Sequence, residues 1–231
     1  MVAPRALLTG GLAALLLAGG LAALAARSAP DGSGASGTSL ERLDTYGRVP
    51  EFALTERSGR RVGRDDLRGF VWVVDFVYTE CTESCPLLSL EMSRLQAEFA
   101  DADLRLVSIT VDPRHDSPAV LRRYAERYGA SPRWLFLTGD TQAIYCLASR
   151  GFHLSVVDQA ATAPPDCDAT VRLGPARAWA SHGSRGLIVH SDRVALVDRA
   201  ARIRAYHRPS DPESLGRLRA NLRRLLAEPR P

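Results

Sequence analysis

The sequence predicts an α/β domain in which helices cover a central mixed sheet. Residues 71–78 form a nearly continuous apolar run, which is typical of a strand covered on both faces. Leucine, methionine and phenylalanine side chains then recur at helical spacing over residues 88–99. The alternation repeats, with an apolar strand at residues 104–111 and a helix from residue 117. Strands that alternate with helices favour a layered α/β architecture.

The remaining elements continue this alternation. Residues 52–62 hold two short apolar runs around a Ser-Gly pair, which indicates a hairpin. Ser117 and Pro118 are typical of a helix cap and a first helical position, and Gly129 ends that helix. The pattern further predicts a strand at 134–137, a helix at 141–148, three strands at 187–189, 194–197 and 203–206, and a last helix from 211.

The N-terminal region predicts a membrane anchor. Residues 6–26 carry no charged side chain, and a run of about 20 apolar residues is long enough to cross a bilayer as a helix. We therefore expect residues 1–27 to anchor the chain in a bacterial-type cytoplasmic membrane, with the domain on the exported side. The alternative is secretion after signal cleavage, because the apolar run ends in Ala-Leu-Ala-Ala.

Composition changes divide the rest of the chain. Residues 28–47 begin with a stretch rich in Gly and Ser and predict a flexible linker. Residues 48–228 form the expected domain, with an irregular insertion at about 154–186 where the periodic pattern is lost. The net charge is only +4, all 30 basic side chains are Arg, and they are spread along the chain. A nucleic-acid-binding domain would carry a clustered basic stripe, so this class is excluded.

Two of the four cysteines lie close together, directly after the first long strand. Cys81 and Cys85 stand in the stretch Glu-Cys-Thr-Glu-Ser-Cys-Pro, where a helix is expected to begin. Two residues four apart share one face of a helix. The free amides of a helix N-terminus favour a thiolate, so we expect a lowered thiol pKa. Paired thiolates suit Cu(I), and an added imidazole also permits Cu(II). A cysteine motif after the first central strand is the arrangement of the thioredoxin-like fold.

The order of motifs resembles the Sco/SenC family of copper proteins, which assist cytochrome c oxidase assembly. The resemblance is carried by Tyr-Thr-x-Cys-x-x-x-Cys-Pro at residues 78–86 and by Ser-Ile-Thr-Val-Asp-Pro at 108–113, followed by Asp-Ser-Pro at 116–118. Further matches lie at residues 50–69 and 133–139. In all, the resemblance covers roughly residues 48–150 and 187–206.

This resemblance implies a third ligand and a partner. The family's distal histidine falls on His190, with His182 as a second choice, and the metal is one copper per domain, as Cu(I), Cu(II) or both. The implied partner is cytochrome c oxidase subunit II or a similar copper-accepting protein. The domain would deliver copper to that partner's binuclear site or prepare its thiols, as a metallochaperone rather than an enzyme.

Two features depart from the family pattern. Ala200 and Ala201 stand in a turn where the family usually has Gly, and Ala at a positive φ is strained, so we expect this turn to differ. Cys167 lies in the poorly matching insertion. In an exported protein it either forms a disulfide with Cys146 or leaves both as unpaired thiols, and the sequence does not choose between these.

Two other activities compete with copper transfer. A thiol–disulfide oxidoreductase would use Cys81 and Cys85 for exchange, with Asp75 handling the proton of the second thiol, as in thioredoxins. Thioredoxins, however, space their cysteines as CxxC. A peroxiredoxin is disfavoured because Tyr78 stands where its motif requires Pro. A module that only senses copper or redox state is the third class, and the sequence does not separate it from a chaperone.

Overall fold

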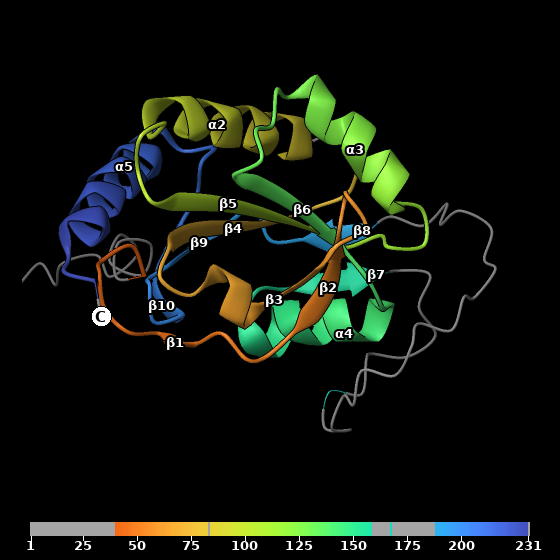
Figure 1. Cartoon of the computed structure of the whole chain (residues 1–231), viewed down its shortest axis with the longest axis horizontal. Helices are drawn as coiled ribbons and strands as arrows, with labels where there is room; N and C mark the ends of the chain where they lie inside the picture. The colour runs from red at the N-terminus through yellow and green to blue at the C-terminus, as the bar shows by residue number, and fades with distance from the viewer. Residues whose placement is uncertain (1–39, 83, 159–166, 168–187, 231) are drawn as a thin grey trace, which may run out of the picture. The chain divides into compact units, whose positions relative to one another are not determined.

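The computed structural model describes residues 40–82, 84–158, 167 and 188–230, which belong to one compact unit. Eight strands form a mixed sheet around the parallel trio β4, β5 and β6 (Figure 1). The strands in spatial order are β1 (Gly47–Arg48), β10 (Arg202–His207), β9 (Val194–Val197), β4 (Val71–Val77), β5 (Leu104–Thr110), β6 (Trp134–Thr138), β2 (Ala53–Glu56) and β3 (Arg61–Gly63).

Helices cover both faces of this sheet, as the sequence predicted. α2 (Ser84–Glu98), α3 (Pro118–Arg127) and α5 (Pro212–Ala227) lie on one face. α4 (Thr141–Cys146) lies on the other and continues as a π-helical turn, η2 (Leu147–Gly151). A short 3-10 helix, η1 (Arg64–Leu67), connects β3 to β4. The result is two hydrophobic layers separated by the sheet.

Strand β4 shows why its sequence is apolar throughout. All seven of its residues are buried, because each face of the strand is covered by helices. Val71, Val73 and Val77 pack in the layer of α2, α3 and α5, whereas Trp72 and Val74 pack in the layer of α4. This division follows from the strand geometry, in which successive side chains point to opposite faces of the sheet. β4 ends at Val77, and α2 begins seven positions later at Ser84.

The predicted helix starts are confirmed in detail. The Ser117 hydroxyl accepts a hydrogen bond from the Val120 amide, and Pro118 is the first residue of α3. α5 begins in the same manner after Asp211, whose carboxylate accepts from the amides of Glu213 and Ser214.

The linker expected over residues 28–47 ends earlier than predicted. Glu41 is buried; the Ser214 hydroxyl donates to its carboxylate at 2.6 Å, and the Asn221 amide donates to its backbone carbonyl at 2.6 Å. Gly47 and Arg48 form β1 at the sheet edge. The composition signal missed this because the contacts come from α5, far along the chain. Residues 28–39 and the expected anchor at 1–27 lie outside the described residues. No described helix has both the length and the apolar character needed to cross a bilayer.

Two further expectations require correction. The insertion expected to be irregular from about residue 154 instead begins with a strand, β7 (Val156–Asp158), which pairs with β8 (Ile188–His190). The turn after Asp198 was expected to differ because it lacks Gly, yet Ala201 adopts φ 59° there. The Asp198 carboxylate holds the turn by accepting from the amides of Ala200 and Arg202, which offsets the cost of the left-handed backbone.

Candidate metal centre

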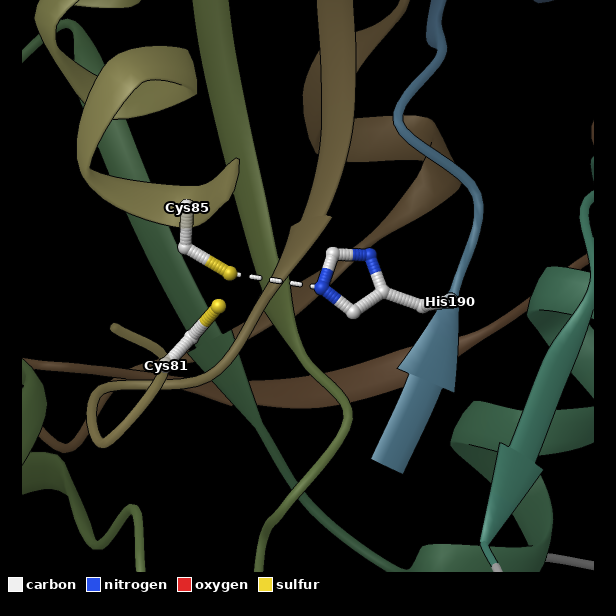
Figure 2. Close-up of side chains that lie close together, drawn as sticks. All are labelled: Cys81, Cys85 and His190. Carbon is white, nitrogen blue, oxygen red and sulfur yellow. Dashed lines mark hydrogen bonds between the residues drawn. The ribbon is translucent and has the colours of Figure 1, made fainter. Parts of the chain in front are cut away.

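Three side chains from two distant parts of the chain converge at one end of the sheet. The thiols of Cys81 and Cys85 and the imidazole of His190 offer ligand atoms that all lie within 4.8 Å of one another. Figure 2 shows the three side chains pointing toward a common centre. His190 Nε2 lies 3.3 Å from Cys85 Sγ. Among the described residues this is the only group of three or more such side chains.

The two thiols lie in different local structures. Cys81 is in the loop after β4 and is partly exposed, and its amide donates to the Tyr78 carbonyl at 3.2 Å. Cys85 is the second residue of α2 and is fully buried. The spacing suggested that the two cysteines share one face of a helix. They do not, because Cys81 lies before the helix begins. The turn between β4 and α2 brings the sulfurs together instead.

The expectation of a lowered thiol pKa is wrong for Cys85. Burial raises the pKa of this thiol, and its neighbour Cys81 raises it further. Desolvation penalises the thiolate more than the helix N-terminus favours it. In the metal-free protein Cys85 is therefore a neutral thiol at pH 7. A bound cation would replace its proton, as coordinating metals do.

His190 is presented to the thiols in its neutral form. Burial lowers the pKa of the imidazole below its usual value. Its Nδ1 lies 3.1 Å from the Ser191 carbonyl oxygen, which can only accept, so Nδ1 carries the ring proton. That leaves the Nε2 lone pair directed at the thiols, which is the tautomer a metal ligand requires. The Tyr78 ring packs edge-on against the imidazole, with centroids 5.8 Å apart.

A buried carboxylate holds the loop that carries Cys81. Asp116 has no exposed surface and accepts from the Thr79 amide at 3.1 Å, the Thr79 hydroxyl at 2.5 Å and the Thr110 hydroxyl at 2.5 Å. His115 Nδ1 lies 3.0 Å from the same carboxylate, and Nε2 lies 3.2 Å from Glu80. The sequence had singled out Asp116 only as part of a motif. Its role as an acceptor for the cysteine loop becomes visible only when β4 and β5 lie side by side.

Asp75 lies beneath the site without belonging to the ligand group. It is fully buried, and strand alternation places it on the same face of β4 as Val73 and Val77, toward α2. Within the part of the chain that the structure describes, no donor meets hydrogen-bond geometry with either carboxylate oxygen, although the Ser108 hydroxyl lies nearby. Burial raises the pKa of Asp75 to about 7, and the nearby Ser108 hydroxyl only partly counteracts this.

The other histidines lie apart from the ligand group. The His207 side chain is buried, and its Nε2 lies 3.2 Å from Nδ2 of the Asn221 side-chain amide. His115 is bound to acidic neighbours, and His153 is exposed on the surface. His182, the second choice for the third ligand, lies outside the described residues.

The remaining two cysteines are joined in a disulfide. Cys146, at the end of α4, is bonded to Cys167, with the two Cα atoms 5.4 Å apart. Of the two alternatives that the sequence left open, the structure therefore has the bridge rather than two thiols. Neither Cys81 nor Cys85 is part of a disulfide.

Comparisons with known proteins agree on one family. The SCO1/SenC family model matches residues 42–227. The SCO1 protein homolog of Bacillus subtilis is 36% identical over 98 residues, which cover 41% of this chain and 51% of that protein. The mitochondrial SCO2 homolog of Mus musculus is 34% identical over 111 residues, covering 45% and 41%. The chain thus spans about half the length of the curated relatives it matches.

Solved structures share the fold. A SCO1/SenC family lipoprotein from Bacillus anthracis superposes with a TM-score of 0.61 at 23% identity, covering 77% of this chain and 94% of that one. The copper-bound ScoI of Bradyrhizobium japonicum has a TM-score of 0.56 at 22% identity, covering 78% and 100%. BsSco, described as a member of the Sco family of cytochrome c oxidase assembly proteins, has a TM-score of 0.61 at 23% identity, covering 81% and 98%.

Proposed function

The chain belongs to the SCO1/SenC family, and we propose that it binds one copper ion through Cys81, Cys85 and His190. The convergence of two thiols and one neutral imidazole within 4.8 Å is the observation that carries this proposal. Soft sulfur ligands favour copper over hard cations such as Mg²⁺ or Ca²⁺. The donor set suits Cu(I) through its thiolates and Cu(II) through its added imidazole.

The copper is cargo rather than a resident cofactor in this proposal. The recipient is the binuclear copper site of a cytochrome c oxidase subunit II, or a similar copper-accepting protein. Cys81 is partly exposed whereas Cys85 is buried, so a partner thiolate would first replace Cys81. Replacement then proceeds one ligand at a time. Each recipient thiol gives up its proton as its sulfur binds copper, and each released thiolate of this chain takes up a proton. The recipient therefore makes bonds to copper and loses its S–H protons, and its other bonds are unchanged.

A second function is favoured by Asp75. The thiols of Cys81 and Cys85, which are not disulfide-bonded, can reduce a disulfide on the partner, giving up two electrons and two protons as a Cys81–Cys85 disulfide forms. Asp75 is a buried carboxyl with a pKa of about 7 on the face of β4 toward α2. It is therefore suited to accept the proton of Cys85 near neutral pH. This activity would prepare the recipient's thiols before copper is transferred.

We further propose that residues 1–27 anchor the domain on the exported side of a bacterial-type cytoplasmic membrane. The supporting feature is the uncharged stretch at residues 6–26. Exposure to an oxidising compartment is consistent with the Cys146–Cys167 disulfide, because such bonds persist mainly outside the cytoplasm.

Copper titration of the full chain in detergent, with Cys81 and Cys85 reduced and the Cys146–Cys167 disulfide intact, tests the ligand set. One equivalent of copper should bind, and Cys81→Ser, Cys85→Ser or His190→Ala should each weaken binding by more than about 100-fold, since loss even of outer-shell partners costs about 10–100-fold. His153→Asn is the matched control, because it removes an exposed imidazole outside the ligand group. Tight binding that survives His190→Ala would reject the three-ligand site. Insulin reduction without copper binding would favour the oxidoreductase.

A further inference from the structure

The third ligand is placed by a separate two-stranded sheet. β8, which ends in His190, pairs with β7 and not with the eight-stranded sheet. Val156 of β7 lies directly opposite His190, and the Ser191 amide donates to the Ser155 carbonyl at 3.0 Å. We call β7 and β8 together the ribbon. The backbone position of His190 therefore depends on where β7 lies.

The N-terminal side of β7 is anchored in the hydrophobic layer of α4. Phe152 is fully buried and packs edge-on against Trp72 and Phe76 of the central strand, with centroids 6.2 and 5.6 Å apart. Its carbonyl accepts from the Tyr206 hydroxyl at 2.9 Å. The Leu154 amide donates to the Ala148 carbonyl at 2.9 Å. These contacts hold the chain up to the first residue of β7.

The C-terminal side of β7 is held by a covalent bond. Nine positions after Asp158 the chain reaches Cys167, which is bonded to Cys146 at the end of α4. Cys146 also begins the turn that leads to Phe152. Both flanks of β7 therefore return to the same helix end. A two-stranded sheet is marginally stable by itself in water, and in this ribbon Val156 packs against the layer of α4, so a second anchor adds to limited support.

We propose that the Cys146–Cys167 disulfide positions His190 for copper, by holding β7 against β8 from a place outside the metal centre. The bond attaches Cys167, nine positions after the end of β7, to the end of α4, and so gives the chain a second covalent attachment point beyond Asp158. Outer-shell supports of this kind determine how well a ligand is oriented. This inference rests on the proposed copper site but concerns only its histidine.

The disulfide is separable from the thiol pair. Neither Cys146 nor Cys167 belongs to the group of potential ligands. Cys81 and Cys85 are held by the β4–α2 junction and pack in the layer on the other face of the sheet. Loss of the disulfide should therefore disturb the imidazole and leave the two sulfurs in place.

Hydrogen exchange of the metal-free full chain tests the placement without any copper. In the double variant Cys146→Ser with Cys167→Ser, backbone amides of residues 155–158 and 188–191 should exchange at least about tenfold faster, because the ribbon opens locally more often. A tenfold change corresponds to a local opening that is about 1.4 kcal/mol more favourable. Amides of β4 and β5 should be unchanged. Leu218→Ala in α5 is the control, because it weakens the opposite layer. Unchanged exchange in the ribbon would overturn the proposal.

A double-mutant cycle then links the disulfide to the ligand. Removing the disulfide should weaken Cu(II) binding by about 10–100-fold in the otherwise unmodified chain. In a chain that already carries His190→Ala it should cause no further loss, because the ligand it supports is gone. An equal loss in both backgrounds would overturn the proposal. Failure of the unmodified chain to bind copper would instead reject the proposed function, and the exchange result would still report on the ribbon.

Discussion

The two halves of the candidate metal centre are built in different ways. The thiols come from one short stretch of chain at the junction of β4 and α2. β4 is an inner strand of the eight-stranded sheet, and the junction follows its last residue. The imidazole comes from the ribbon, which lies outside that sheet. Among the described contacts, the thiol half is supported by buried strands and a buried carboxylate. The ribbon is supported by Val156, which packs against the layer of α4, by the Phe152 anchor and by a disulfide.

This difference indicates how such a site can release a metal. Ligands in a rigid frame hold their cargo, whereas a ligand on a weakly supported element is displaced more readily than a buried ligand in that frame. Local opening has its lowest free energy where few buried contacts hold the backbone. We therefore expect His190 to move after the partly exposed Cys81 has been replaced and before Cys85 leaves when copper is passed on.

The anchor of the ribbon offers the strongest test. Phe152→Ala should lower the free energy of unfolding by about 3–5 kcal/mol, because a fully buried aromatic ring is lost from contact with Trp72 and Phe76. Urea unfolding measures this cost. Phe136→Ala, which removes a buried ring from the opposite layer, is the matched control. Phe152→Ala, but not Phe136→Ala, should lower the affinity for Cu(II) to about that of His190→Ala. An equal loss of Cu(II) affinity in Phe152→Ala and Phe136→Ala would contradict the division of the site into two halves.

Asp75 tests the thiol half through pH. Its pKa in the folded protein is raised by burial to about 7, above the unfolded value of 3.8. The stability it contributes is therefore full below about pH 4 and is lost as pH rises through 7. The total is on the order of 4 kcal/mol, at 1.36 kcal/mol for each pH unit.

Asp75→Asn removes this dependence. The variant should gain stability over the unmodified chain as pH rises from about 4 to 7, by up to that amount. Urea unfolding at a series of pH values gives the difference. Asp101→Asn, an exposed carboxylate, should show no comparable trend. A difference for Asp75→Asn that does not vary with pH would show that the carboxyl is not titrating in this range.

Asp116 tests the loop that carries Cys81. Asp116→Asn should cost about 2 kcal/mol, because hydrogen bonds to a charged acceptor contribute about 1.5–3 kcal/mol. It should also speed alkylation of Cys81 in the metal-free protein, since the Thr79 amide and hydroxyl lose their acceptor. Peptide mapping after iodoacetamide treatment reports this rate. Exchange of the ribbon amides should stay unchanged, and a change there would indicate that the halves are coupled.

The smallest effect concerns the protonation of His190. Because burial lowers the pKa of this imidazole, its neutral form persists to a lower pH than that of an ordinary histidine. The affinity ratio between the unmodified chain and His190→Ala should therefore begin to fall only at a pH below the usual histidine pKa. Below the lowered pKa it should fall by about tenfold per pH unit, as one proton competes with the metal. A ratio that falls at or above the usual histidine pKa would contradict the neutral, partly buried imidazole.

Much of the fold could be predicted from local patterns. The apolar run that became β4, the helical spacing of α2 and the Ser-Pro start of α3 each reflect interactions within a few residues. The parts that were wrong depend on distant partners. Residues 40–47 looked like linker because α5, which binds them, lies at the other end of the chain. β7 was missed because three residues with no periodic context form a strand only when β8 pairs with them.

The sequence by itself determined the thiol pair, since Cys81 and Cys85 are neighbours along the chain after a recognisable strand. It also pointed to His190, through resemblance to a family rather than through any local signal. Only the tertiary structure brought the imidazole to 3.3 Å from Cys85 and buried that thiol so that its pKa rises rather than falls. It alone joined Cys146 and Cys167 in a disulfide, nine positions beyond the end of β7. Distance and desolvation depend on what packs around a residue, and packing partners far apart in sequence leave no local pattern.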